Sequence, residues 1–302
     1  MQDEIILGDN LEVLPRFPDA SFQLVYADPP FNTGRAQQRL TLATVADENG
    51  NRTGFGGRRY RSELLEQSSF RDAFDDYLAF VEPRLRELRR VLRDDGTLYF
   101  HIDYREAHYC KLVLDDLFGR ECFLNEIIWA YDYGARAKRR WPAKHDTIFV
   151  YVKDPARYFF DSEAVDREPY MAPELVTAEK AARGKLPTDC WWHTIVPTTS
   201  AEKTGYPTQK PEGIVRRMVQ ASSRPGDWCL DAFAGSGTLG AVARKLDRRY
   251  VLIDSNPEAV RVMRERLGRA ITSQPDVARH RQADPPALAR RLSDGGAARA
   301  DG

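Results

Sequence analysis

Residues 228–238, Trp-Cys-Leu-Asp-Ala-Phe-Ala-Gly-Ser-Gly-Thr, join a short apolar run to two closely spaced glycines. The run predicts a buried strand, and Gly235 and Gly237 allow a sharp turn before a helix over 239–246. Free N–H groups at the start of that helix favour a carboxylate or a phosphate. The next strand ends at Asp254, where a carboxylate can accept hydrogen bonds from ribose hydroxyls. The unit fits a nucleoside-bearing cofactor, although a purely structural turn would use the same Gly-x-Gly pair.

Further apolar runs, separated by helical segments, extend this unit into an α/β fold. The first three runs are each closely followed by an aspartate, as is typical of buried strands whose carboxyl ends face a ligand. The segment 74–92 has apolar residues at helical spacing, and Asp94-Asp95-Gly96 predicts its end. We predict a mostly parallel sheet from the runs 5–7, 22–27, 97–102, 125–131, 147–152, 228–233 and 250–254.

A second motif, Asp28-Pro29-Pro30-Phe31, follows the predicted strand 22–27. The two prolines stiffen the backbone and keep it out of a helix, so the carbonyls of Asp28 and Pro29 can face a ligand. A carboxylate, a fixed carbonyl and a flat ring are together the complement of an exocyclic amine on an aromatic ring. A proline-rich turn with a buried phenylalanine would explain the isolated motif equally well.

The composition excludes several classes of protein. The 302 residues carry 45 Lys+Arg and 45 Asp+Glu, so the chain is not a globally basic nucleic-acid binder, and its 42% hydrophobic content excludes disorder throughout. The chain has no long uncharged apolar window and opens with acidic residues, which predicts a soluble, cytoplasmic protein. The four cysteines are widely spaced, so we expect neither a disulfide framework nor a metal site.

Taken together, the two motifs resemble those of the amino-methylating DNA methyltransferases that use S-adenosylmethionine (AdoMet). In that family an (Asp/Asn/Ser)-Pro-Pro-aromatic motif accompanies a Phe-x-Gly-x-Gly motif, and the catalytic motif precedes the cofactor motif in the β-class. The resemblance implies a Rossmann-like, seven-stranded fold with circularly permuted motif order. Further family landmarks occur in the expected order: Gly8-Asp9, Asn32-Thr33-Gly34, residues 95–101, residues 125–129, residues 208–211 and Ser255-Asn256-Pro257.

The resemblance also assigns roles to individual residues. It implies a catalytic set that binds the target amino group, with the last residue stacking on a flipped base: Asp28, Pro29, Pro30 and Phe31. It implies a cofactor set that binds AdoMet and releases S-adenosylhomocysteine: Asp9 at the adenine amine, Asp254 at the ribose, Phe233, Gly235 and Gly237 around the methionine, Asp231 and Thr238 at the amino-acid group, and Thr208 with Lys210 closing the site.

DNA affinity must come from local clusters of basic residues, because the net charge of the chain is zero. Two basic runs that contain no acidic residue, residues 52–61 and 136–144, lie in predicted connections. They include or adjoin Tyr60 and Trp141 and could meet phosphates and unstacked bases. A solvated charged loop is the alternative for either run. The candidate DNA-binding residues are Arg58, Arg59, Arg136, Lys138, Arg139, Arg140 and Lys144.

The chain is expected to form one catalytic domain, residues 1–270, followed by a disordered tail, residues 271–302. Residues 35–69 are polar and glycine-rich and predict a flexible DNA-facing loop, whereas the proline-rich residues 153–207 match the family's inserted target-recognition region. Double-stranded DNA is the expected partner and a membrane is not. A cognate restriction endonuclease and a homodimer remain open.

Asp-Pro-Pro-Phe resembles the adenine-N6 version of the family more than the Ser-Pro-Pro version common among cytosine-N4 enzymes. Adenine N6 is therefore the expected target, with cytosine N4 as the alternative. Methylation of RNA or of a protein glutamine would favour an initial Asn, and a catalytically inactive nucleic-acid-binding module would not need Asp28 and Asp254.

Overall fold

The computed structural model describes residues 1–32, 37–46, 52–53, 59–70, 74, 76–134, 137–268 and 271–273. The chain divides into two compact units, the first made of residues 1–31 and everything from Asp76 onward, the second of Asn32–Asp75. The described helices include none with the length and apolar character needed to cross a membrane.

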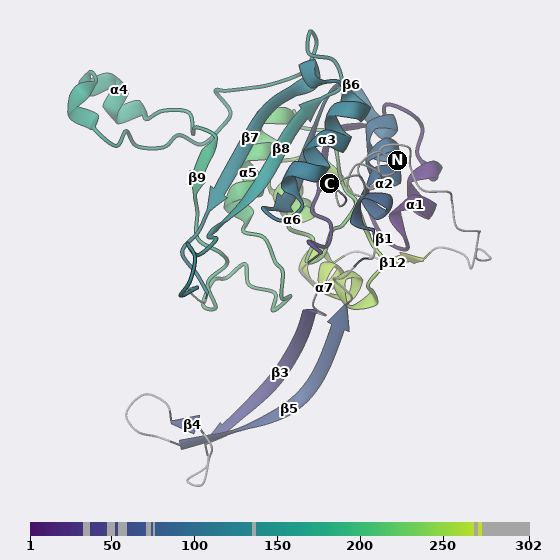
Figure 1. Ribbon diagram of the computed structural model, residues 1–302, viewed down its shortest axis with the longest axis vertical. Helices are drawn as coiled ribbons and strands as arrows, with labels where there is room; N and C mark the ends of the chain where they lie inside the picture. The colour runs from purple at the N-terminus through teal and green to yellow at the C-terminus, as the bar shows by residue number, and fades with distance from the viewer. Residues whose placement is uncertain are drawn as a thin grey trace, which may run out of the picture. The chain divides into compact units, whose positions relative to one another are not determined.

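The first unit is built on a nine-stranded sheet with the order β12-β1-β11-β10-β2-β6-β8-β7-β9 (Figure 1). Strand β8 is antiparallel to both of its neighbours, and the other pairings are parallel. The mostly parallel sheet expected from the sequence is therefore confirmed. The strands are β1 Glu4–Leu7, β2 Phe22–Ala27, β6 Leu92–Asp103, β7 Phe123–Ala130, β8 His145–Val152, β9 Cys190–Trp192, β10 Trp228–Asp231, β11 Arg249–Asp254 and β12 Ile271–Ser273.

Two short edge strands extend the expected seven-stranded sheet to nine. Strand β9 pairs with β7, and β12 pairs with β1, so residues 271–273 are a strand and not part of a disordered tail. Residues 274–302 lie outside the described part of the chain. A three-residue edge strand depends on backbone hydrogen bonds to one neighbour, which leave no hydrophobic period in the sequence.

Helices cover both faces of this sheet. Ile214, Leu239 and Met263 from α5, α6 and α7 share one core cluster with Leu24 and Tyr26 of β2. On the other face α2 packs against α3, and alternate strand residues point there because the side-chain period of a strand is two. The helices are α1 Asn10–Val13, α2 Tyr77–Val91, α3 Ala107–Phe118, α4 Ala178–Arg183, α5 Glu212–Ser222, α6 Thr238–Lys245 and α7 Pro257–Leu267, with 3-10 turns at Leu14–Arg16, Arg120–Cys122 and Pro173–Leu175.

Helix α2 confirms the expected helix over 74–92, but it ends earlier than predicted. Asp76 caps its start by accepting from the N–H of Ala79. The helix stops at Val91, and Asp94-Asp95-Gly96 lies inside β6, where the register between β2 and β6 shifts. Asp94-Asp95-Gly96 therefore forms an irregularity within β6 and not a loop between helix α2 and the strand.

The second unit contains a long hairpin where an irregular loop was expected. Strands β3 (Gln37–Ala46) and β5 (Arg59–Phe70) are antiparallel, and β4 (Arg52–Thr53) pairs with β5. The expectation of a flexible loop over 35–69 is wrong at the level of the backbone. The two strands satisfy each other's backbone groups, so the hairpin does not need the apolar alternation that a sequence search relies on.

Candidate active site

The two sequence motifs meet at one edge of the sheet. Strands β1, β11, β10 and β2 are consecutive neighbours and run parallel, so the residues that follow them share the same edge. Asp231 at the end of β10 pairs with Tyr26, two residues before Asp28. Asp254 at the end of β11 pairs with Leu7, two residues before Asp9. The order of these strands brings the four predicted acidic residues to one edge.

Asp28 is mostly buried, and its two carboxylate oxygens lie in different environments. Its Oδ2 accepts a hydrogen bond from Lys210 Nζ at 2.6 Å, in an ion pair whose side chains are 13% and 12% exposed. Its Oδ1 is buried and has no hydrogen-bond partner among the described residues. His101 lies on the side of Oδ1, with its Nδ1 3.9 Å away. Oδ1 is therefore closed to solvent, and Lys210 holds Oδ2.

A buried polar network lies next to Asp28. His101 is fully buried, with Nδ1 2.8 Å from the Tyr26 hydroxyl and Nε2 3.2 Å from Asp146 Oδ2. Tyr131 donates to Asp146 Oδ1 at 3.1 Å. Burial alone would raise the pKa of Asp146, but the interactions with His101, Lys210 and Tyr131 together outweigh burial and lower that pKa. Sequence reasoning assigned no chemistry to His101, and its contacts fit a structural role.

Phe31 and the prolines form a rigid wall beside this carboxylate. The Phe31 ring centroid lies 5.7 Å from that of His101, and Lys210 Nζ lies 4.7 Å from the Phe31 ring centre. Tyr77 of α2 donates to the Pro30 carbonyl at 2.7 Å, which fixes the end of the motif. The aromatic face, the carboxylate and a cation are therefore in contact.

The glycine motif turns as the sequence predicts. Gly235 has φ +50° and donates its N–H to Asp254 Oδ2 at 2.8 Å. Gly237 has φ +72° and is the N-cap of α6, where no side chain caps the helix. A Cβ at Gly237 would lie 2.8 Å from Met263 Cγ, so only glycine fits. The amides at the start of α6 remain suited to an anion.

Sequence reasoning overlooked Gly240, which completes a Gly-x-Gly-x-x-Gly spacing with Gly235 and Gly237. A Cβ at Gly240 would lie 2.7 Å from Leu252 Cδ1 and 2.9 Å from Leu267 Cδ1. The missing side chain lets α6 pack closely on β11, the role of the third glycine in a dinucleotide-binding turn. The spacing itself was the signal that could have identified it.

Like Asp254, the other two predicted cofactor acids, Asp9 and Asp231, already have protein partners. Asp9 caps α1 through the N–H of Leu11 and forms an ion pair with Arg84 at 2.8 Å. Asp231 is almost fully buried and accepts from the N–H of Phe233 at 3.1 Å. Burial, followed by the negative charges of Asp28 and Asp254, raises the pKa of Asp231 well above its usual value. These contacts leave the proposed roles of both acids at the cofactor as predictions.

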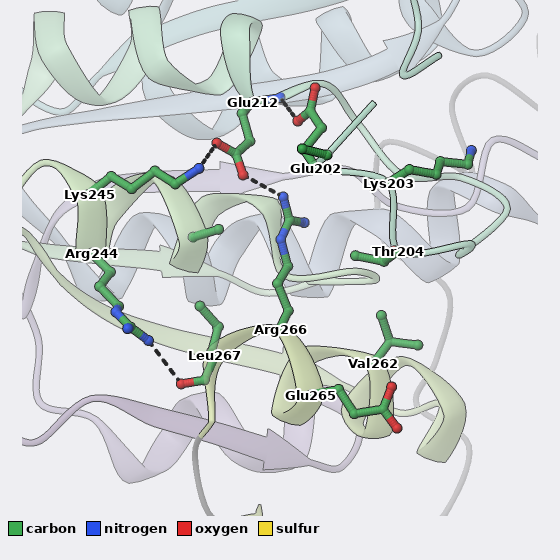
Figure 2. A pocket seen from close by; sticks show the side chains of 12 residues that line it. Glu202, Lys203, Thr204, Glu212, Arg244, Lys245, Val262, Glu265, Arg266 and Leu267 are labelled. Carbon is green, nitrogen blue, oxygen red and sulfur yellow. Dashed lines mark hydrogen bonds and ion pairs between the residues drawn. The ribbon is translucent and has the colours of Figure 1, made fainter. Parts of the chain in front are cut away.

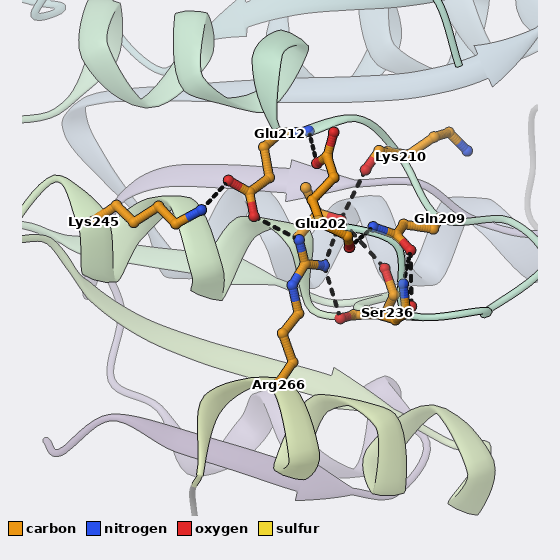
Figure 3. Close-up of polar contacts among 9 residues, drawn as sticks. Glu202, Gln209, Lys210, Glu212, Ser236, Lys245 and Arg266 are labelled. Atoms are coloured by element: carbon orange, nitrogen blue, oxygen red, sulfur yellow. Dashed lines mark hydrogen bonds and ion pairs between the residues drawn. The ribbon is translucent and has the colours of Figure 1, made fainter. Parts of the chain in front are cut away.

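The segment that was expected to close the site is fixed by its own polar contacts (Figure 3). The Thr238 hydroxyl donates to the Lys210 carbonyl at 3.0 Å and accepts from Arg266 at 3.2 Å. Gln209 accepts from the N–H of Thr204 at 2.8 Å and donates to the Glu202 carbonyl at 2.6 Å. The Lys210 backbone thus lies beside the start of α6, while its side chain reaches Asp28. Thr208 is exposed.

The basic loop between β7 and β8 is partly as expected. Lys138, Arg139 and Arg140 are exposed, and the neighbouring Trp141 is 95% exposed. Lys144 instead donates to the backbone carbonyls of its own loop, at Tyr133 and Gly134. Arg58 and Arg136 lie outside the described residues, and Arg59 begins β5, where only the backbone is described. DNA binding by these residues stays a prediction.

A charged cavity of about 500 Å3 lies apart from Asp28 and Phe31, between α5, α6 and α7 (Figure 2). Two of its cations are engaged within the protein, since Arg266 and Lys245 both bind Glu212, at 2.7 and 2.5 Å. Neither Asp28 nor any aromatic side chain lines this cavity. We therefore place the candidate active site at the motif edge.

The sequence model of the DNA methylase family, N6_N4_Mtase, matches residues 22–265, which contain both motifs and the strands that hold them. The chain belongs to this DNA methylase family. The expected family is confirmed, whereas the circular permutation implied by the motif order stays a prediction. One relative, the DNA adenine methyltransferase YhdJ of Escherichia coli (strain K12), is 30% identical over 299 residues, covering 96% of this chain and 88% of YhdJ.

Two solved structures share the fold at low sequence identity. The M1.HpyAVI–SAM complex matches with a TM-score of 0.55 and 17% identity, covering 87% of this chain and 98% of that chain. The cytosine-N4-specific PvuII DNA methyltransferase matches with a TM-score of 0.59 and 16% identity, covering 88% and 87%. The Rossmann-like α/β architecture of this methylase is therefore that of AdoMet-dependent DNA methyltransferases.

Proposed function

We propose that this DNA methylase transfers a methyl group from AdoMet to the exocyclic N6 of a flipped adenine in double-stranded DNA. The observation that carries the proposal is the pairing of β2 with β10, which puts the carboxylate of Asp28 next to the glycine turn. Such a transfer requires a group that binds the target amine and a turn that binds the nucleoside cofactor, and both lie at one edge of the sheet.

The residues at the edge fit AdoMet in charge and shape. The uncapped start of α6 offers N–H groups to the cofactor carboxylate, and Gly235 and Gly237 leave room for a ligand against the backbone. Each carboxylate oxygen of Asp254 accepts a hydrogen bond from a backbone N–H group. These two bonds fix the carboxylate in an orientation for further hydrogen bonds to ribose. Asn10 adds a buried Oδ1 that has no partner among the described residues.

The chain's own residues then orient the acceptor amine. When bound, AdoMet supplies a methyl group that its sulfonium already activates. Asp28 and the Pro29 carbonyl accept the two amine N–H groups, which favours a pyramidal nitrogen with its lone pair directed at the methyl. Asp28 also stabilises the positive charge that develops on nitrogen. Phe31 stacks on the base, which must leave the duplex to reach it.

Adenine is the favoured base, and cytosine N4 is the second candidate. Asp-Pro-Pro-Phe is the adenine-type form of the motif, and the relative YhdJ is named as an adenine methyltransferase. The fold of the PvuII enzyme supports cytosine N4 as the alternative, because that enzyme is named as cytosine-N4-specific and has the same fold. The two exocyclic amines present similar donors to Asp28.

Mass spectrometry of nucleosides separates the two candidates directly. DNA from a host without its own methylation, expressing the chain, is digested and compared with DNA from a host expressing Asp28→Ala. We expect N6-methyl-2′-deoxyadenosine only with the wild-type chain, and a transfer rate at least roughly 10²-fold lower for the variant, which still binds AdoMet. N4-methylcytosine would establish the second candidate, and equal activity of Asp28→Ala would refute the mechanism. Sequencing of the methylated sites identifies the recognition sequence.

A further inference from the structure

Lys210 occupies the position where an acceptor amine is expected. Its ammonium donates to Asp28 Oδ2 at 2.6 Å and lies 4.7 Å from the centre of the Phe31 ring. A base that stacked on Phe31 would present its amino group to the same oxygen. The ion pair is largely shielded from solvent, so the contact is an internal one and not a surface pairing.

Asp28 offers no second accessible oxygen to such an amine. Oδ1 is buried on the side of the His101 ring, 3.9 Å from Nδ1. Any acceptor amine must therefore approach Oδ2, and it meets the Lys210 ammonium there. The two donors compete for one oxygen unless the lysine side chain moves.

The backbone of Lys210 provides a fixed pivot for that movement. Its carbonyl is held by the Thr238 hydroxyl at 3.0 Å, and Thr238 is the first residue of α6. The flanking Gln209 is 8% exposed and bonded at both ends of its amide (Figure 3). The flexible four-carbon stem can thus swing between Asp28 and the start of α6 without any backbone change.

We propose that Lys210 is a positioning residue with two alternative partners, which occupies the amine site on Asp28 until the carboxylate of AdoMet draws its ammonium to the start of α6. The assignment rests on the proposed function for the location of AdoMet and for the binding of the target amine to Asp28. It makes AdoMet binding and base binding mutually favourable, because vacating Asp28 benefits the second ligand as much as the first.

A double-mutant cycle without DNA tests the proposal. AdoMet affinity is measured by calorimetry for the wild type, Asp28→Asn, Lys210→Met and the double variant. Asp28→Asn releases Lys210, so we expect it to tighten AdoMet by about fivefold or more relative to its effect in the Lys210→Met background. With decarboxylated AdoMet, which lacks the attracting carboxylate, the same cycle should show no coupling. Lys210→Arg should restore part of the coupling.

The controls separate this proposal from the function itself. Lys203→Met changes an exposed lysine of the same segment and should leave every affinity unchanged. If Lys210→Met does not fold, the ratio of AdoMet to decarboxylated AdoMet affinity in wild type and Asp28→Asn carries the same information. Equal effects of Asp28→Asn in both backgrounds, or equal coupling with both ligands, would overturn the proposal. Absence of any AdoMet binding would instead overturn the proposed function.

Discussion

At the residue scale, the most unusual group is the carboxyl of Asp231, 2% exposed at the end of β10. Burial and the charges of Asp28 and Asp254 raise its pKa well above the value of an unfolded chain. A carboxyl group with a raised folded-state pKa contributes stability below its unfolded pKa, about 3.9, and loses it as the pH rises through the folded value. Asp231 therefore makes the ligand-free protein less stable as the pH increases.

Replacing Asp231 with Asn should remove this pH dependence. The Asn Oδ1 can still accept from the N–H of Phe233, so the turn is kept. We expect the stability of Asp231→Asn relative to wild type to increase between pH 4 and pH 7, by up to about 1.4 kcal/mol per pH unit inside the titration window. Urea unfolding of both proteins at several pH values measures the difference, and a difference independent of pH would contradict the assignment.

At the scale of the element, the start of α6 depends on the absence of a side chain at Gly237. Gly237→Ala should cost the left-handed backbone penalty of about 1–2 kcal/mol together with about 1–3 kcal/mol for the clash with Met263. Gly268→Ala is the matched control, because Gly268 has φ +60° but an added Cβ meets nothing within 4 Å. Denaturant unfolding should show the larger loss at Gly237, and equal losses would show that the turn tolerates the side chain.

The loop between β7 and β8 is the element expected to bind phosphates. Replacing both Arg139 and Arg140 with Ala should weaken DNA binding and reduce the slope of log K against log salt by about 2. The control changes Arg120 and Arg157 to Ala, since both are exposed and lie at the opposite ends of β7 and β8. Fluorescence anisotropy at several salt concentrations measures both pairs, and the hypothesis fails if they change the slope equally.

At the scale of the whole molecule, the chain divides into a sheet unit and a hairpin unit, and we expect the sheet unit to fold without the hairpin. Within the hairpin unit, Asn32 Oδ1 accepts from the N–H of Phe74 at 3.1 Å, so a short linker can join the two ends. Replacing residues 36–71 with a short Gly/Ser linker should lower the unfolding temperature by about 4 °C or less and retain AdoMet binding.

The same deletion tests whether the hairpin faces DNA. We expect the shortened chain to lose DNA affinity while it keeps AdoMet affinity, because residues 52–61 carry one of the two basic runs. A Gly/Ser linker of the original length controls for the shortened connection. Unchanged DNA affinity would refute the DNA-facing role, and a collapse of thermal stability would refute the independence of the two units.

The net charge of zero conceals an uneven distribution of acidic and basic residues. Acidic residues gather at the motif edge, where burial and the negative charges of Asp28 and Asp254 raise the pKa of Asp231. Exposed basic residues gather on the loop after β7. Charges of opposite sign at separate places cancel in the total, so the sum of charges carries little information about DNA binding.

The sequence by itself determined the local chemistry of both motifs. Gly235 and Gly237 adopt left-handed backbone angles that other residues resist, and an apolar run followed by Asp28-Pro29-Pro30 has few conformations open to it. These properties depend on neighbours along the chain, so the strand, the turn and the helix at 228–246 could be predicted closely. The family follows from the same residues.

Tertiary structure alone decided which groups touch. The Lys210 ammonium binds Asp28 across 182 residues, and His101 meets Tyr26 and Asp146 from three different strands. No periodicity records such contacts, because they follow from the order of strands in the sheet. The hairpin and the edge strand β12 escaped prediction for a related reason, since backbone pairing between distant segments leaves no pattern in the side chains.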